Sequence, residues 1–195
     1  MNNDQLVIIG GSAGSLEAIL EMLPLFQPDN GFAYLLVLHR KNSDSILSNL
    51  LADKTKLQVK EAEEKEPISP GCLYIAPADY HLLIEQDRSF SLDDSEKVNY
   101  SRPSIDVSFE SASEVFGRSL IGILLSGANA DGALGMKAIQ ERGGVTIAQD
   151  PEDATVSYMP QSAINEGAVD YIAKAADIPR LLAQLQQNGS RTTML

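Results

Sequence analysis

The feature that most constrains the fold is an apolar, mostly β-branched run that ends abruptly in glycines near the start of the chain. Residues 6–9 are Leu-Val-Ile-Ile, and residues 10–15 are Gly-Gly-Ser-Ala-Gly-Ser. Apolar residues at helical spacing follow from Leu16, so the segment predicts a strand, a tight turn and a helix. Glycines suit such a turn because a Cβ would clash where the backbone bends sharply. The pattern places one serine, Ser12, at the apex.

The residues of this turn alone leave three interpretations open. Gly10, Ser12 and Gly14 have the spacing of a nucleophile elbow, where a serine attacks the substrate and amides at a helix N-terminus stabilise the oxyanion. In the second interpretation Ser12 only caps the following helix. In the third, the turn binds a phosphate, as dinucleotide-binding turns do. That fingerprint needs three glycines, and serines stand at two of the three positions, so its match is incomplete.

Apolar strands alternate with helical patterns along the rest of the chain. Strands are predicted at residues 32–38, 58–62, 72–76, 119–125, 145–149 and 168–172. Near-continuous apolar strands of this kind are typical of a parallel sheet covered on both faces. Residues 81–85 and 89–92 bracket a short polar turn and predict an antiparallel hairpin appended to the sheet. The expected fold class is therefore α/β: a doubly wound, mainly parallel sheet flanked by helices, Rossmann-like, in three layers.

Length and composition predict one globular domain over residues 1–195, with a core at about 6–185 and a frayed tail at 188–195. Fifteen Lys and Arg against 27 Asp and Glu give a net charge of −12, which argues against a broad nucleic-acid surface. The sequence shows neither a signal-peptide pattern nor an apolar run long enough to span a bilayer. The single cysteine, Cys72, fits a reducing compartment. We therefore expect a cytoplasmic protein that binds no nucleic acid and does not insert into membranes.

Three reactive side chains follow predicted strands: Ser12, His39 and Asp131. The carboxyl ends of parallel strands share one edge of the sheet, where ligands bind. A serine nucleophile needs a base, which a third group must orient, and these residue types supply that set. The other histidine, His81, begins the hairpin and is either structural or at the rim of the site. The chain order Ser, His, Asp differs from that of α/β-hydrolases, so the pattern alone leaves a serine-hydrolase triad and a nucleotide-binding module evenly matched.

Several segments in the same order resemble the catalytic domain of the chemotaxis protein-glutamate methylesterase (CheB) family, from Leu6 to about Leu185. Residues 10–15 are similar to the family's Gly-Ala-Ser-Thr-Gly-Gly elbow. His39 matches the histidine of its Gln-His-Met, and Asp131 matches the aspartate of its Gly-Met-Gly-Asn-Asp-Gly segment. Further family blocks lie at residues 60–62, 74–77, 102–106 and 132–136.

The resemblance implies a serine esterase that hydrolyses γ-glutamyl methyl esters on chemoreceptors to glutamate and methanol in chemotaxis adaptation. Many members also deamidate receptor glutamines. In the implied mechanism Ser12 is the nucleophile, His39 the base and Asp131 the group that orients the base, with no metal or cofactor. The resemblance further implies an oxyanion hole or site rim at Ala13 and Ala128, and substrate binding by Arg102 and His81.

The chain departs from the family pattern in three site residues and in its organisation. Ala13 replaces a threonine, Ala128 a methionine, and Arg40 a methionine, which puts a cation beside the base. Well-known members carry an N-terminal receiver domain, whereas here the catalytic pattern begins within ten residues of Met1, so we expect no control by a receiver domain in cis. The expected partners are methyl-accepting chemotaxis receptors and a separate response regulator or methyltransferase. The alternative is a non-catalytic CheB-like module that binds receptors.

Overall fold

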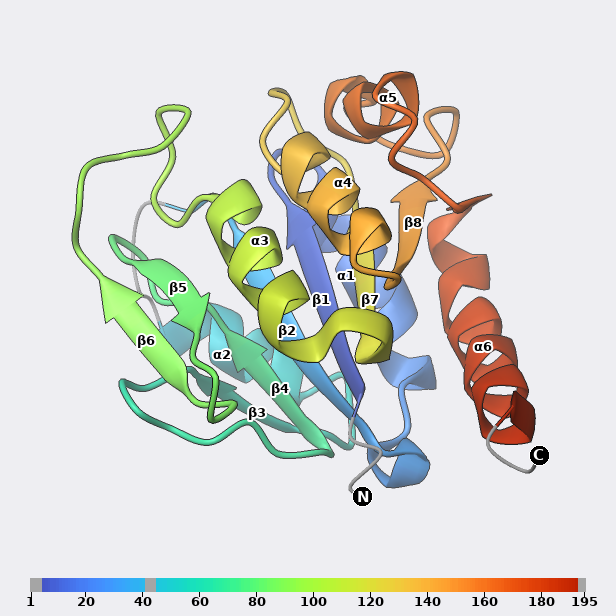
Figure 1. Cartoon of the computed structure of the whole chain (residues 1–195), viewed down its shortest axis with the longest axis horizontal. Helices are drawn as coiled ribbons and strands as arrows, with labels where there is room; N and C mark the ends of the chain where they lie inside the picture. The colour runs from blue at the N-terminus through green and yellow to red at the C-terminus, as the bar shows by residue number, and fades with distance from the viewer. Residues whose placement is uncertain (1–4, 41–44, 193–195) are drawn as a thin grey trace.

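Alternating strands and helices build a parallel sheet with helices on both faces (Figure 1). A computed structural model describes residues 5–40 and 45–192. Within these residues seven parallel strands pair in the order β3-β4-β2-β1-β7-β8-β9. The strands are β1 (Gln5–Gly11), β2 (Phe32–Leu38), β3 (Gln58–Glu61), β4 (Cys72–Ile75), β7 (Leu120–Leu124), β8 (Val145–Gln149) and β9 (Tyr171–Ala173). The helices are α1 (Ser15–Met22), α2 (Ser45–Ala52), α3 (Ile105–Phe116), α4 (Ala133–Glu141), α5 (Tyr158–Asn165) and α6 (Ile178–Thr192).

Successive residues of β1 point to opposite faces and thereby join two hydrophobic cores. Leu6 and Ile8 pack with side chains of α3, α4 and α5 on one face. Val7 and Ile9 pack with side chains of α1, α2 and α6 on the other. Because both faces are covered, β2 is buried along its whole length, as expected for a central strand of a parallel sheet. The predicted three-layer α/β class is confirmed.

The predicted hairpin is confirmed, but it forms a sheet of its own. Strands β5 (His81–Ile84) and β6 (Phe90–Asp93) pair antiparallel and do not extend the parallel sheet. They pack against α3, where Ser108 Oγ donates a hydrogen bond to the Leu82 carbonyl at 2.7 Å and the Ile84 amide donates to Ser111 Oγ at 3.2 Å. The hairpin therefore supports the middle of α3.

Several strands begin or end one residue from the predicted position, and the two larger differences lie near the C-terminus. The last strand covers residues 171–173 instead of 168–172. Helix α6 continues to Thr192, beyond the expected core limit near residue 185, so it extends into the segment expected to be frayed; residues 193–195 lie outside the described residues. Ile178 and Leu182 are both buried, and their i, i+4 spacing fixes one face of this helix on the sheet.

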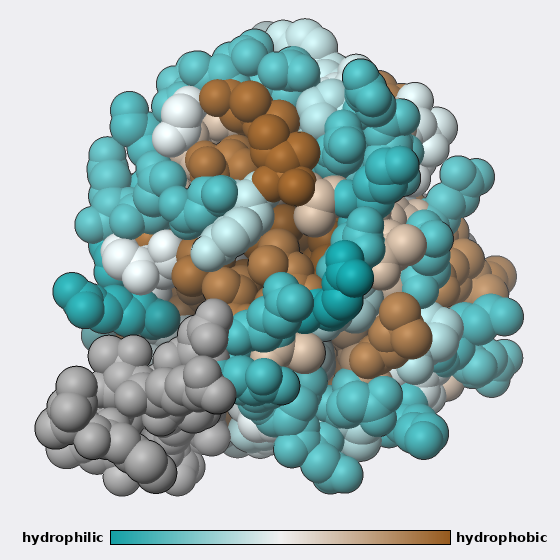
Figure 2. Space-filling model, turned by 90° about the vertical axis from the view of Figure 1, so that its right-hand side faces the viewer, coloured by the Kyte–Doolittle hydropathy of each residue, from teal (hydrophilic) through white to brown (hydrophobic). Residues whose placement is uncertain are grey.

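The side of the molecule formed by β8, β9 and α6 carries apolar surface among hydrophilic residues (Figure 2). Ile172, on the edge strand β9, is 54% exposed there. A cavity of about 370 Å³ beside it is lined in part by Tyr171 and Leu181 and by none of the predicted site residues. Among the described helices, none combines the length and apolarity that crossing a membrane requires.

Candidate active site

Strand pairing brings Ser12 and His39 to the same edge of the sheet. Gly11 of β1 lies opposite Leu38 of β2, so the next residue of each strand is a predicted site residue. The His39 amide donates a hydrogen bond to the Gly11 carbonyl at 3.2 Å. On the other side, the Ser12 amide donates to the carbonyl of Ser126, just after β7, at 2.9 Å. Ser12 is thus held between the ends of two neighbouring strands.

The turn at Ser12 has the form of an elbow and not of a serine cap. Helix α1 begins at Ser15, and its N-cap is Gly14. Ser15 Oγ instead donates a hydrogen bond to the Ser12 carbonyl at 2.7 Å. Ser126 Oγ donates to the Ala13 carbonyl at 2.7 Å and so braces the elbow from β7. The interpretation of Ser12 as a helix cap is therefore wrong, and its Oγ is left without a hydrogen bond to any described residue.

Gly14 is the position where this elbow depends most on glycine. Its φ is +78°, and an added Cβ would lie 2.5 Å from Thr155 Cβ. We expect Gly14→Ala to destabilise the protein by about 2–4 kcal/mol, because backbone strain adds to crowding. Gly167→Ala is the matched control, since Gly167 has a φ of +68° but nothing within 4 Å of the added atom. Denaturant unfolding of both variants tests this, and equal losses would show that crowding at Gly14 contributes nothing.

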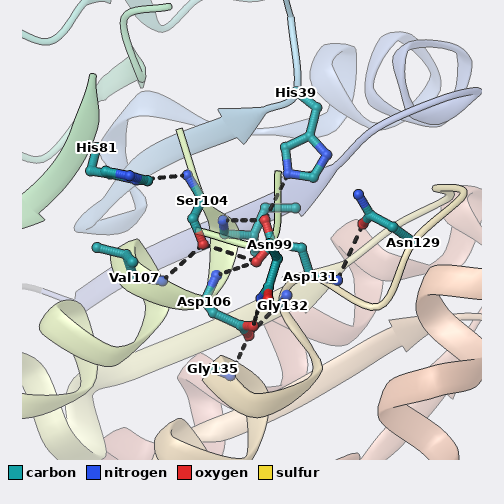
Figure 3. Close-up of polar contacts among 11 residues, drawn as sticks. His39, His81, Asn99, Ser104, Asp106, Val107, Asn129, Asp131, Gly132 and Gly135 are labelled. Carbon is teal, nitrogen blue, oxygen red and sulfur yellow. Dashed lines mark hydrogen bonds and ion pairs between the residues drawn. The ribbon is translucent and has the colours of Figure 1, made fainter. Parts of the chain in front are cut away.

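His39 and Asp131 are in direct contact (Figure 3). His39 Nε2 lies 2.7 Å from Asp131 Oδ2, and the aspartate side chain is fully buried. The second ring nitrogen, Nδ1, makes no hydrogen bond within the described chain. Because Nε2 faces the carboxylate, Nδ1 is the nitrogen left for the Ser12 hydroxyl. No Ser12–His39 hydrogen bond is formed among the described residues, as is common before a substrate is bound.

The Asp131 carboxylate also binds the N-terminus of α3 (Figure 3). Oδ2 accepts from the Ile105 amide at 2.7 Å. Oδ1 accepts from Ser104 Oγ at 2.9 Å and from the Asp106 amide at 3.1 Å. Burial raises the pKa of Asp131, but the hydrogen bonds from His39 and then from the α3 amides outweigh it and hold the pKa below its ordinary value. Asp131 is therefore ionised at neutral pH and can stabilise an imidazolium on His39.

Ala13 and Ala128 are both exposed at this edge of the sheet. The Ala13 amide donates to no described residue, and it directly follows Ser12 in the elbow. It is therefore available to an oxygen of a bound substrate. Ala128 lies in the loop between β7 and α4.

Arg102 and Arg40 border a cavity of about 580 Å³ that includes His39 in its lining. Arg102 Nη1 donates to the carbonyls of Asp94 at 2.6 Å and Ser95 at 2.7 Å, and so braces the loop before it. The Arg40 guanidinium pairs with Glu61. Both cations are thus partly committed to protein groups.

His81 does not line this cavity and is 1% exposed. Its Nε2 donates to the Glu96 carbonyl at 3.0 Å, and its Nδ1 accepts from the Ser104 amide at 3.1 Å. Both ring nitrogens are occupied by the protein. This geometry argues against the predicted substrate contact and in favour of a structural role beside the N-terminus of α3.

A second cavity, of about 560 Å³, lies on the Asp131 side of the site. Its lining includes Tyr100, Leu134 and Tyr158, whose exposed fractions are 98%, 62% and 60%. Tyr100 lines both cavities. Clusters of exposed apolar side chains around a site are typical of surfaces that bind another macromolecule.

Sequence reasoning missed the residues that hold the site together. Ser104 lies in the family block at residues 102–106, where its residue type predicts only an N-cap. In the structure its Oγ caps α3 by accepting from the Val107 amide at 3.4 Å, and its hydroxyl also binds Asp131. Asp106 and Ser126 were not singled out, although both are buried. Only Ser126 had a signal in the sequence, as a polar residue directly after the strand predicted at residues 119–125. No group of three or more His, Cys, Asp or Glu side chains within residues 5–40 and 45–192 is arranged to hold a metal ion.

A serine elbow beside a histidine that contacts a buried aspartate, at the carboxyl edge of a parallel sheet, is the arrangement of an α/β enzyme of the hydrolase class. Comparison with known proteins gives the family. The family model described as CheB methylesterase matches residues 7–182. The chain belongs to the CheB methylesterase family.

Individual relatives agree with this assignment. A relative from Leptospira interrogans is 46% identical over 188 residues, which cover 96% of this chain and 97% of that protein. A protein-glutamate methylesterase/protein-glutamine glutaminase of Carboxydothermus hydrogenoformans is 40% identical, and the match spans 93% of this chain and 55% of that protein. The crystal structure of the Thermotoga maritima CheB methylesterase catalytic domain superposes with a TM-score of 0.89 at 34% identity, covering 93% of this chain and 98% of that one. The fold and family expected from the sequence are thereby confirmed.

Proposed function

We propose that this chain hydrolyses γ-glutamyl methyl esters on methyl-accepting chemotaxis receptors, leaving glutamate and releasing methanol. The observation that carries the proposal is the contact of 2.7 Å between His39 and the buried Asp131, beside the elbow that presents Ser12. Membership of the CheB methylesterase family supports the choice of substrate.

In the proposed acylation step, Ser12 Oγ attacks the ester carbonyl carbon while His39 Nδ1 takes its proton. Asp131 keeps the other ring nitrogen protonated and stabilises the imidazolium that forms. The carbonyl oxygen gains negative charge, which the Ala13 amide stabilises. Collapse of this intermediate breaks the bond to the methoxy oxygen, and the imidazolium returns the proton to it, so methanol leaves and an acyl-Ser12 ester remains.

Deacylation repeats these roles with water as the nucleophile. His39 removes a proton from water, which attacks the acyl-enzyme, and Ser12 leaves with that proton. A receptor glutamine would follow the same path with ammonia as the leaving group, so deamidation is a second proposed reaction. The open cavities and the exposed Tyr100, Leu134 and Tyr158 favour a protein segment as substrate over an enclosed small molecule.

We place this activity in the cytoplasm and propose that a separate response regulator or methyltransferase acts with it. The net charge of −12 favours neither nucleic acid nor an anionic membrane surface as a partner.

The test incubates the full chain with membranes that contain methyl-labelled receptor, and measures released methanol. We expect release above the rate with heat-inactivated protein, and labelling of Ser12 by a fluorophosphonate probe, because phosphonylation needs an activated serine. Ammonia release from receptors that carry glutamine tests the second reaction. Receptor binding with neither methanol release nor Ser12 labelling would instead establish the non-catalytic module.

A further inference from the structure

The N-terminal amides of α3 and of α4 are each bound by an aspartate from the beginning of the other helix (Figure 3). Asp131 precedes α4 and accepts hydrogen bonds from α3 amides, as described above. Asp106 lies in the first turn of α3 and accepts from α4: its Oδ1 binds the Gly132 amide at 2.9 Å and the Gly135 amide at 2.7 Å. Helix α4 has no side-chain cap of its own. Asp106 therefore supplies the cap that α4 lacks.

Asp106 acts on the residue that follows Asp131. The Gly132 amide is the next backbone donor after Asp131, and its hydrogen bond to Asp106 fixes the backbone from which the Asp131 side chain projects. Close packing holds the two helices at this distance, because a Cβ on Gly135 would lie 2.5 Å from Phe109 Cβ and 3.1 Å from Asp106 Cα. The direction of Asp131 toward His39 thus depends on both carboxylates.

The pair brings two buried negative charges together. Asp106 is 9% exposed and Asp131 is 1% exposed. Among the described residues, neither carboxylate pairs with a lysine or arginine, and His39 is the one ion-pair partner. Asn99 Nδ2 reaches Asp106 Oδ2 at 3.3 Å. Other titratable groups around Asp106 are Glu166, Tyr100 and Tyr158 across the shared cavity and His81 behind Ser104.

We propose that Asp106 is a positioning residue for the reaction: it holds Asp131 in line with His39 and adds a second negative charge behind the imidazolium that forms there. This inference rests on the esterase function proposed above. Asp106 touches no reacting atom and acts through Asp131. Burial and then repulsion by Asp131 raise the pKa of Asp106 to about 6, against hydrogen bonds from Gly135 and Gly132 that lower it, so its charge is fully present only above that pH.

Asp106→Asn separates the charge from the shape, because the amide oxygen can still accept from Gly132 and Gly135. We expect kcat at pH 8 to fall about tenfold with KM changed less than twofold, since Asp106 is only 9% exposed in the cavity it lines and its carboxylate is bound to Gly132, Gly135 and Asn99. The acid limb of the pH profile of kcat should move to lower pH by half a unit or more, because the negative charge of Asp106 no longer favours the protonated form of the His39–Asp131 pair. A purely structural role would change neither the limb nor the ratio of kcat to KM in a folded variant.

Two further variants complete the test. Asp170→Asn is the matched control: Asp170 also accepts from a backbone amide, that of Thr146 at 2.9 Å, but it lines neither cavity of the site, so kcat and pH profile should stay as in the wild type. Asn99→Gly removes the hydrogen bond to Asp106 and suits the positive φ of 51° at that position. Asn99→Gly should shift the acid limb of the pH profile in the same direction by a smaller amount. If Asp106→Asn does not fold, this shift tests the positioning role of Asp106 in its place.

A measurement without turnover keeps this inference separate from the proposed function. Carboxyl carbon NMR of the protein labelled at aspartate should show Asp106 titrating near pH 6, and the midpoint should fall when Asp131 is replaced by Asn. An unchanged midpoint overturns the coupling even if the chain hydrolyses no ester. Conversely, an active wild type with kcat and acid limb unchanged in Asp106→Asn overturns the positioning role and leaves the esterase function standing.

Discussion

Ser12→Ala is expected to abolish methanol release from methylated receptor, with a loss in kcat of at least about 10⁴-fold. A site without its nucleophile keeps only binding and oxyanion stabilisation, and neither makes the acyl-enzyme. The fold should persist, because the contacts of Ser12 are made by its backbone: the amide donates to Ser126 at 2.9 Å, and the carbonyl accepts from Ser15 Oγ at 2.7 Å. Methanol release and denaturant unfolding measure the two effects.

Ser113→Ala is the control for this substitution. Ser113 is a buried serine of α3 whose Oγ donates to the Glu110 carbonyl at 2.7 Å, and it does not contact the site. The same change of residue type should leave turnover as in the wild type. A Ser12→Ala variant that keeps a tenth of the wild-type rate would mean that another group attacks the ester.

The sequence predicted the sheet because the buried strands consist of unbroken apolar runs. All seven residues of β2 are buried, and an unbroken apolar run of this length between turn residues is typical of a central parallel strand. The hairpin was also visible, since its alternation and turn are local. Its separation from the main sheet was not, because the pattern of β5 and β6 is the same whether they extend a sheet or pack on α3.

At the site, the sequence predicted the three residues of the triad but not the residues that hold them in place. Ser12, His39 and Asp131 each follow a strand, and strand order alone places them at one edge. The partners of Asp131 come from the start of α3, 25 to 27 residues away in sequence. Such contacts depend on how α3 packs against α4, which hydrophobic periodicity leaves undetermined. The same reason explains why His81, a plausible rim residue in the sequence, is buried behind Ser104.

Asp131→Asn is expected to lower kcat by roughly 10³–10⁴-fold, in line with the loss of the orienting carboxylate in other triads. An asparagine cannot satisfy this position in either orientation. With its NH₂ group toward His39 Nε2, it forces the ring proton onto Nδ1, which can then no longer accept the proton of Ser12. With its oxygen toward His39, the NH₂ group faces the Asp106 amide, and two donors meet where Oδ1 now accepts.

The same substitution should change how stability depends on pH. Asp131 has a folded pKa below its ordinary value of 3.8, so its ionised form stabilises the native state above that pH. This contribution is lost as the pH falls through the folded pKa. The difference in free energy of unfolding between the wild type and Asp131→Asn should therefore be largest at pH 7 and should decrease below about pH 4.

Turnover at pH 8 and unfolding at several pH values test both halves of this prediction, with Asp170→Asn as the control for an aspartate outside the site. Serine labelling by a fluorophosphonate should be lost together with turnover, because both need His39 to accept the serine proton through Nδ1. A variant that loses receptor hydrolysis but keeps wild-type labelling would show that Asp131 serves substrate binding and not the orientation of His39.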